Sequence, residues 1–279
     1  MDLEHVLDDE VFFNFALLEY EPKKSFAGKL RVGNILLYSF DILRCNGSYY
    51  NLVKEIRKEI GLNQTVWGIK KIGNVICWEL YFYRQYQPDK IKIKEIGNIF
   101  AKHFAVGEFD VDEDLPYLMF SFDLESNNDK IENLHMYFDE PVENNFRAWS
   151  YKIRENQKEY ENYYEFVLSS DKQRILAKLF ASPYIDSQVD VSRILIPELM
   201  DCTFLCFAAK RNENGIYFWG INVEQFIFFL KQFDYPEQLV AFVEKHKENL
   251  DYVQFDVGFD YYIEGNTFKI RKSGFYGTF

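Results

Sequence analysis

Alternating apolar and polar residues predict β-strands along much of this chain. In FSFDLES (residues 120–126) every second residue is apolar, and Asp123 falls on the opposite face of the strand. Similar patterns occur in LYSFDIL (residues 37–43) and in YVQFDVGFD (residues 252–260). The pattern predicts three strands that share one apolar face and carry a carboxylate at the same step of the other face.

Five pairs of such segments are predicted, most of them joined by short turns. They cover residues 12–20 with 29–43, 65–71 with 75–84, 117–125 with 132–140, 201–210 with 215–222, and 252–263 with 267–279. Glycine and asparagine in the turns, as in Ile72-Gly73-Asn74, supply the positive φ that tight hairpins require.

Helical patterns lie between the pairs. The predicted helices cover residues 48–62, 89–104, 145–168, 171–180, 222–233 and 235–250. The first has a serine at its start and apolar residues at Leu52, Ile56 and Ile60, followed by Gly61 as a stop. The chain therefore predicts helix–strand–strand units repeated around five hairpins, within a single domain that covers residues 1–279.

The two faces of the predicted strands differ in character. The apolar face needs cover, which the amphipathic helices supply, whereas the other face is polar, aromatic and charged. An open sheet would leave this second face in solvent, and a closed sheet would gather it in an interior. Because ten antiparallel strands exceed the usual size of a twisted open sheet and leave two edges, we expect an α+β protein with a ten-stranded antiparallel β-barrel and outer helices.

Composition supports an enclosed aromatic interior. Aromatic residues make up 19% of the 279 residues, with 28 Phe and 20 Tyr, which is more than a plain core requires. The net charge of −12 argues against binding to nucleic acid or to an anionic membrane. No apolar run is long enough to span a bilayer, and the first ten residues are acidic, unlike a secretory signal. We therefore expect a cytoplasmic protein.

The predicted polar faces supply the candidate site residues. The basic ones are Lys29, Arg31, Lys70, Lys269 and Arg271, and the acidic ones are Asp41, Glu79, Asp123, Glu125, Asp139, Asp256 and Asp260. Cross-strand ion pairs are one interpretation of this set, and an aromatic-lined pocket for a charged small molecule is the other. The sequence contains no phosphate-binding loop, no H-E-x-x-H metal motif and no G-x-S-x-G motif.

Five helix–strand–strand units around a ten-stranded barrel resemble the ABBA-type aromatic prenyltransferases over most of the chain. That family transfers a prenyl group from an isoprenoid diphosphate to an aromatic small molecule or peptide side chain. The resemblance implies a diphosphate site of Lys29, Arg31, Lys70, Lys269 and Arg271, and a carbocation shield of Tyr81, Tyr83, Tyr137 and Tyr217. It implies Glu79 or Asp123 as the base, and it requires no cofactor, although Mg²⁺ between the carboxylates and the diphosphate is compatible with it.

Two other functions fit the sequence. One is a non-catalytic acidic binding protein, of the immunity or inhibitor kind, whose negative charge meets a basic partner. The other is a carrier for a hydrophobic or cationic small molecule in the same interior. A catalytic barrel requires its cations to converge in one pocket, whereas a binding protein requires its acids outside and its interior filled.

Overall fold

The computed structural model describes residues 2–8, 10, 19–84, 92–108, 116–126, 128–138, 140–142, 145–152, 157–182, 189–265 and 267–279. Over these residues, one eleven-stranded sheet dominates the fold, with the strand order β6-β4-β2-β1-β13-β12-β11-β10-β9-β8-β7. Its strands are β1 (Val66–Ile72), β2 (Val75–Tyr83), β4 (Tyr117–Glu125), β6 (Leu134–Phe138), β7 (Glu140–Val142), β8 (Asn145–Lys152), β9 (Gln157–Val167), β10 (Phe204–Ala209), β11 (Asn214–Ile221), β12 (Phe255–Glu264) and β13 (Thr267–Thr278). A second sheet pairs β3 (Ala105–Val106) with β5 (Lys130–Ile131) in parallel.

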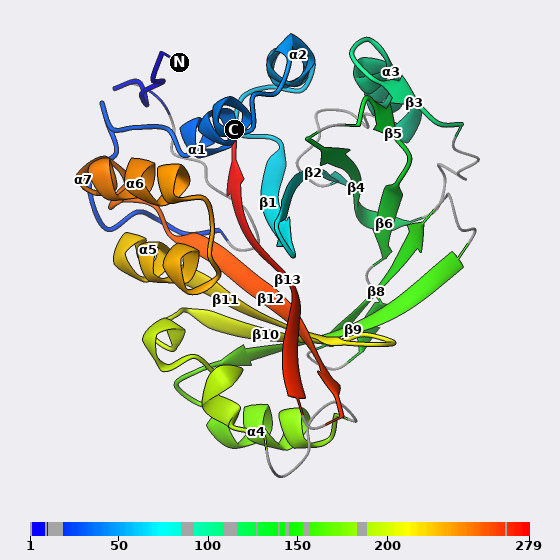
Figure 1. Ribbon diagram of the computed structural model, residues 1–279, viewed down its shortest axis with the longest axis vertical. Helices are drawn as coiled ribbons and strands as arrows, with labels where there is room; N and C mark the ends of the chain where they lie inside the picture. The colour runs from blue at the N-terminus through cyan, green and yellow to red at the C-terminus, as the bar shows by residue number, and fades with distance from the viewer. Residues whose placement is uncertain are drawn as a thin grey trace.

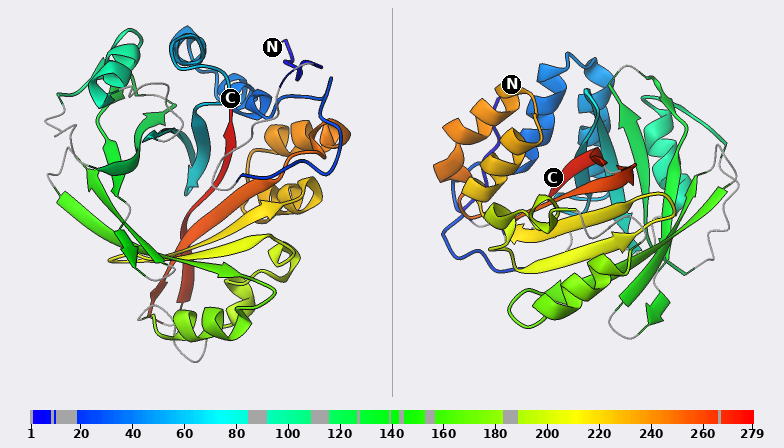
Figure 2. Two further views of the ribbon diagram at one scale, coloured as in Figure 1. Left: turned by 180° about the vertical axis from the view of Figure 1, so that it is seen from behind. Right: turned by 60° about the horizontal axis from the view of Figure 1, so that its bottom comes forward.

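The large sheet is antiparallel throughout and curls into a half-barrel (Figures 1 and 2). Its two end strands, β6 and β7, follow each other in the chain, so the ends of the sheet lie close together, and β6 also contacts β8. Among the described residues, no ladder of hydrogen bonds joins β6 to β8. The α+β architecture is therefore confirmed, whereas the expected closed ten-stranded barrel is wrong, because the described sheet has eleven strands and ends at β6 and β7 without a ladder between its two ends.

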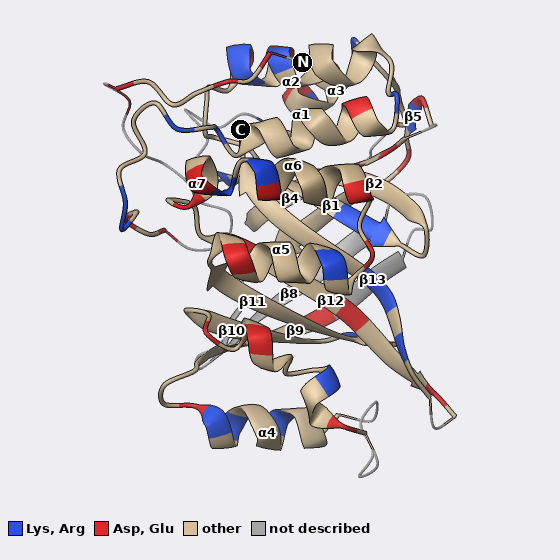
Figure 3. Ribbon diagram, turned by 60° about the vertical axis from the view of Figure 1, so that its left-hand side comes forward, with Lys and Arg blue, Asp and Glu red and all other residues tan. Residues whose placement is uncertain are grey.

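The helices lie on the outer, convex side of the sheet (Figure 1). They are α1 (Gly33–Ile42), α2 (Gly47–Glu59), α3 (Ile93–Ala101), α4 (Lys172–Phe180), α5 (Val223–Gln232), α6 (Glu237–Lys245) and α7 (Lys247–Leu250), with short 3₁₀ turns at Val191–Arg193 and Pro197–Leu199. Both acidic and basic residues occur on the helical layer (Figure 3). None of the described helices combines the length and hydropathy required to span a bilayer.

The main core lies between the convex face and the helices. Phe226 of α5 stacks on Phe255 of β12 with ring centroids 4.1 Å apart, and Phe40 of α1 meets Trp78 of β2 edge-on at 4.9 Å. Such aromatic pairs contribute about 0.5–1.5 kcal/mol beyond the area that they bury. The expectation that helices cover the apolar strand face is confirmed.

Residues 29–43 were predicted to form a strand, but residues 33–42 form helix α1. Residues 37–43 alternate as a strand does, but α1 is buried on several sides, and a short apolar run of this kind cannot be assigned from periodicity alone. Its buried Asn34 donates hydrogen bonds to the backbone of Glu4 and Arg31. The SFD copy at residues 39–41 is therefore helical, and most of the predicted partner strand (residues 12–20) lies outside the described residues.

Residues 145–168 were predicted to form a helix, but they form strands β8 and β9. The glutamates and lysines of this segment favour helices, while its many aromatic residues favour strands, and sheet pairing decided between them. In β9, Tyr164 stacks on Phe207 of β10, while Glu161 and Tyr163 reach the concave side. The hairpins β1–β2, β10–β11 and β12–β13, the pair β4–β6 and helices α2 to α6 agree with the sequence-based assignment.

Candidate functional site

The concave side of the sheet, which we call the lumen, contains a cavity of about 170 Å³. Among the described residues, six tyrosines line it, namely Tyr81, Tyr83, Tyr137, Tyr163, Tyr217 and Tyr276. The lysines of the described chain that line it are Lys70, Lys210 and Lys272. The strand alternation therefore separates the faces as predicted, with the apolar side chains under the helices and the ionic and phenolic groups in the lumen.

Two lysines meet at one buried carboxylate. Asp260 of β12 is only 1% exposed, and its Oδ2 lies 2.9 Å from both Lys210 Nζ and Lys272 Nζ. Tyr217 donates its hydroxyl to Asp260 Oδ1 over 3.3 Å, and Glu161 lies 3.8 Å from Lys210. Lys210 and Lys272 therefore share a single carboxylate partner at this point.

Charge coupling keeps all three groups ionised. Burial by itself lowers the pKa values of Lys210 and Lys272, but Asp260 reverses the effect and raises both above the ordinary lysine value. Burial likewise opposes ionisation of Asp260, yet the two ammonium groups hold its pKa well below the usual aspartate range. These lysines are therefore positively charged at neutral pH.

Glu79 of β2 is completely buried, with 0% exposure. Its carboxylate contacts the Lys70 ammonium and accepts hydrogen bonds from Tyr81 Oη at 2.6 Å, from Ser121 Oγ and from Tyr137 Oη at 3.3 Å. These partners satisfy the buried charge, and an unpaired one would cost several kcal/mol. Glu79 therefore holds Lys70 and two tyrosines in position.

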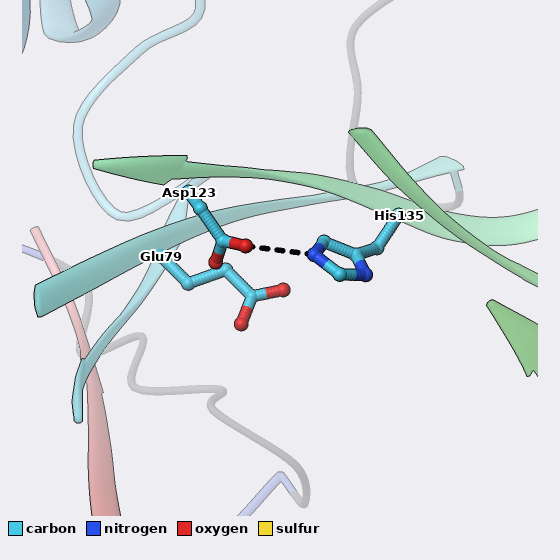
Figure 4. A group of neighbouring side chains, drawn as sticks. All are labelled: Glu79, Asp123 and His135. Atoms are coloured by element: carbon cyan, nitrogen blue, oxygen red, sulfur yellow. Dashed lines mark hydrogen bonds and ion pairs between the residues drawn. The ribbon is translucent and has the colours of Figure 1, made fainter. Parts of the chain in front are cut away.

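Asp123 of β4 and His135 of β6 form a hydrogen-bonded pair, with 2.8 Å between Asp123 Oδ2 and His135 Nε2 (Figure 4). Burial opposes ionisation of Asp123, but Lys70 and His135 hold its pKa well below the ordinary value, so it is a carboxylate that only accepts hydrogen bonds. In the neutral form of the imidazole, Nε2 carries the proton that Asp123 accepts, and Nδ1 is the ring nitrogen with a free lone pair. His135 itself lines the cavity.

Glu79, Asp123 and His135 also bring three potential metal ligands within 4.8 Å of one another (Figure 4). The Lys70 ammonium, however, contacts Glu79 and lies 3.6 Å from Asp123. Mg²⁺ prefers six oxygen ligands in octahedral geometry, whereas this set offers a histidine nitrogen and already holds a cation. The residues present therefore do not fit Mg²⁺.

The lumen changes character along the strands. Val66 and Lys70 both face it from β1, and four residues of strand separate them by roughly 13 Å. Val66 packs with Tyr81 and Tyr83, next to Met119. We call the Val66, Tyr83 and Met119 region the apolar end, and the Lys70, Lys210 and Lys272 region the lysine end.

The tyrosines of the lumen are neutral. Burial raises the pKa values of Tyr81, Tyr137, Tyr163 and Tyr217 well above that of an ordinary phenol. A neutral phenol ring stabilises a cation that is held against its π face.

The structure brings together only part of the predicted site. Lys70, Glu79 and Asp123 meet in the lumen, and the four predicted tyrosines Tyr81, Tyr83, Tyr137 and Tyr217 line the cavity. Lys29 and Arg31 do not belong to this group, because they precede helix α1. Lys29 pairs with Asp251 and Arg31 with Glu10.

Lys269 and Arg271 were also predicted wrongly. Their side chains are 43% and 51% exposed and pair with Glu264 and Glu213. A register shift between Asp260 and Tyr261 pairs these residues with Lys272 and Ile270, so that Arg271 is skipped. This bulge reverses the side-chain alternation of β13, and Lys272 enters the lumen in place of Lys269 and Arg271.

The sequence held a signal for this bulge. Phe268 and Phe275 are both buried under the outer layer, but seven residues separate them, which strict alternation forbids. Counting back from Tyr276 by twos gives Gly274 and then Lys272, the residues that face the lumen. Lys210 ends the predicted strand 201–210 but was not among the predicted cations, and in the structure it follows β10 directly.

Comparison with known proteins gives no further guidance, since the sequence matches no family model and no curated protein.

Proposed function

We propose that this protein is a prenyltransferase-like enzyme that moves an isoprenoid group from an allylic diphosphate to an aromatic acceptor within the lumen. One observation carries the proposal: three lysines converge at one end of a tyrosine-lined cavity whose other end is apolar. A ligand with an anionic head and an apolar tail matches this distribution. The strand order also supports it, because β13 pairs with β1 and the sheet wraps around its own concave face.

The lysine end would receive the diphosphate. Lys210 and Lys272 share one carboxylate, that of Asp260. Because each ammonium group has three N–H donors, a diphosphate oxygen can accept further hydrogen bonds from both lysines. When the allylic C–O bond breaks, its electron pair leaves with the diphosphate, and the lysines stabilise the growing negative charge. The allylic cation then lies between the neutral rings of Tyr81, Tyr217 and Tyr276, which stabilise it and exclude water.

An aromatic acceptor completes the reaction by forming a new C–C bond and releasing a ring proton. Glu79 and Asp123 were the predicted bases, but Glu79 is occupied by four partners, and Asp123 lies behind His135. His135 lines the cavity with Nδ1 as its basic nitrogen. We assign the proton to His135 Nδ1, with Asp123 and Glu79 as positioning residues.

The two alternative functions, an acidic binding protein and a small-molecule carrier, make different demands on the structure. An acidic protein that binds a basic partner requires its acids outside, but Glu79 and Asp260 are buried in the lumen, and the outer helices carry both signs of charge (Figure 3). A small-molecule carrier would use the same cavity without turnover. Turnover therefore decides between the enzyme and the carrier.

The test compares dimethylallyl diphosphate with its saturated analogue 3-methylbutyl diphosphate, which cannot form an allylic cation. Both ligands should raise the unfolding midpoint by about 5 °C at a hundredfold excess over Kd. Only the allylic compound, incubated with 1-naphthol or N-acetyltyrosine amide, should release diphosphate and give a product heavier by one prenyl group. Stabilisation by both ligands without product would indicate a carrier, and no stabilisation by either would reject the proposal.

A further inference from the structure

His135 of β6 keeps one ring nitrogen available to a ligand. Its Nε2 is bonded to Asp123, whereas Nδ1 has no hydrogen-bond partner in the described part of the chain. The side chain is 12% exposed, and Nδ1 retains accessible surface, unlike Nε2 of His103, which is buried without a partner. Leu134 and Met136, on either side of His135, are buried in the core under the helices, so His135 points into the cavity that it lines.

The cross-strand register places His135 towards the apolar end of the lumen. Val66 of β1 pairs with Tyr81 of β2, and Tyr81 pairs with Ser121 of β4. Ser121 in turn pairs with His135. His135 therefore shares a row of the sheet with Val66, and Lys70 lies four residues, or roughly 13 Å, further along β1. A diphosphate held at the lysine end leaves Nδ1 to the second substrate.

Nδ1 suits a hydrogen-bond donor, because the unprotonated nitrogen of a neutral imidazole only accepts. The tyrosine hydroxyls of the cavity wall have already committed their protons. Tyr81 and Tyr137 donate theirs to Glu79. Tyr163 donates to Glu161. The donor for Nδ1 is therefore expected from the ligand.

We infer that the aromatic acceptor is a phenol whose hydroxyl donates a hydrogen bond to His135 Nδ1. The inference rests on the proposed function, which it deepens by naming the acceptor class. A phenol combines the electron-rich ring that the reaction requires with a single O–H donor. Tyr83 and Met119, which line the cavity at the apolar end, supply contact surface for the ring.

The contact also specifies the first proton that reaches Nδ1. When a ring carbon attacks the allylic cation, the positive charge of the ring is shared with the hydroxyl oxygen. Nδ1 takes the hydroxyl proton, and the O–H electron pair completes the C=O bond of a cyclohexadienone. The C–H proton at the attacked carbon then moves to this oxygen and restores the phenol. In total one C–C bond forms, one C–H bond breaks and one proton is released.

The test uses 1-naphthol and 1-methylnaphthalene, in which a methyl group takes the place of the hydroxyl. Their Kd values are measured by calorimetry for the wild type and for two variants. The Nε2 amide of His135→Gln can still donate to Asp123, but the variant lacks Nδ1, whereas His135→Asn puts an oxygen near the Nδ1 position and loses the Asp123 contact. We expect the preference for 1-naphthol to fall about five- to tenfold in His135→Gln and to be retained in part in His135→Asn.

A purely structural role of His135, as a support for Asp123, predicts the reverse order of the two variants, and that order would overturn the inference. So would an equal probe ratio in the wild type and His135→Gln, or a lack of binding of both probes to the wild type up to their solubility limits. If His135→Asn does not fold, the comparison of the wild type with His135→Gln still decides.

The probes carry no isoprenoid group, so this inference and the proposed function fail separately. If the diphosphates have no effect but the probe ratio responds to His135→Gln, the transfer reaction is rejected and the phenol subsite is retained. If prenyl transfer occurs but the ratio does not respond, the phenol contact is rejected and the transfer reaction is retained.

Discussion

Tyr217 packs directly on the backbone of Gly258, its cross-strand partner in β12. A Cβ atom built on Gly258 would lie 2.2 Å from Tyr217 Cδ1, and one on Gly215 would lie 2.9 Å from Tyr217 Cε2. Two glycines therefore make room for this ring beside Asp260, whose carboxylate receives the Tyr217 hydroxyl.

Replacing Gly258 with alanine should push the Tyr217 ring away from the sheet and into the cavity. We expect Gly258→Ala to lower the free energy of unfolding by about 1–3 kcal/mol, as overpacking usually does. It should also weaken binding of dimethylallyl diphosphate. The control is Gly97→Ala in helix α3, where a new Cβ would meet nothing within 4 Å and alanine favours the helix. The free energies of unfolding of both variants are measured by denaturant titration. Equal losses in Gly258→Ala and Gly97→Ala would contradict the packing of Tyr217 on Gly258.

Lys272 and Lys269 offer a matched pair on one strand. Lys272→Met removes an ammonium group from the lumen, and we expect a roughly 10- to 100-fold weaker Kd for dimethylallyl diphosphate, since a hydrogen bond to a charged group contributes about 1.5–3 kcal/mol. Lys269→Met should leave the Kd unchanged, because its ammonium pairs with Glu264 on the surface. If Lys269→Met weakened the Kd more than Lys272→Met, the diphosphate site would instead lie at Lys269 and Arg271, as the sequence predicts.

Stability should depend on pH through the buried aspartates. The pKa of Asp260 is lowered in the folded protein from the ordinary value of 3.8, and that of Asp123 is lowered as well. A lowered carboxyl pKa stabilises the fold above the unfolded value, and the stabilisation is lost as pH falls through the folded value. Unfolding midpoints should therefore decline progressively below about pH 4.

Asp260→Asn tests the source of this pH dependence. The substitution leaves Lys210 and Lys272 without their shared carboxylate, and we expect a loss of about 3–5 kcal/mol at pH 7. The difference from the wild type should shrink as the pH falls below 4, because the carboxyl then becomes protonated in the unfolded wild-type chain and the stabilisation by the folded-state carboxylate is progressively lost. The surface variant Glu264→Gln should show neither effect, and a pH-independent difference for Asp260→Asn would rule out this assignment.

Lys70 should make the protein indifferent to divalent metals. Its ammonium lies between Glu79 and Asp123, so neither Mg²⁺ nor EDTA should change the unfolding midpoint or the diphosphate affinity of the wild type. Lys70→Met leaves Glu79 buried without its cation, and we expect a loss of about 3–5 kcal/mol. Mn²⁺, bound by Glu79, Asp123 and His135, should then restore part of the midpoint in the variant alone. Stabilisation of the wild type by Mn²⁺ would show that Lys70 does not block the site.

The strand faces were predictable because alternation is a local property. In β4, Phe120 and Phe122 could face only the helices if Asp123 faced the other way, and the structure agrees. The same alternation predicts that Tyr81, Tyr137 and Lys70 share one face, and all three line the cavity. It failed in α1, where a short alternating run is helical and buried on several sides, and in β8 and β9, where sheet pairing overrode helix propensity.

The sequence by itself determined which residues are apolar, which alternate and how many carboxylates and tyrosines the lumen can hold. Only the tertiary structure decided which cations enter it. One bulge, between Asp260 and Tyr261, shifts the register of β13, so Lys272 enters the lumen, whereas Lys269 and Arg271, nearer the β12–β13 turn, are exposed and pair with Glu264 and Glu213. Lys210 reaches Asp260 because β10, β11 and β12 are adjacent in the sheet. Strand register and pairing depend on contacts between distant segments, and local patterns do not record them.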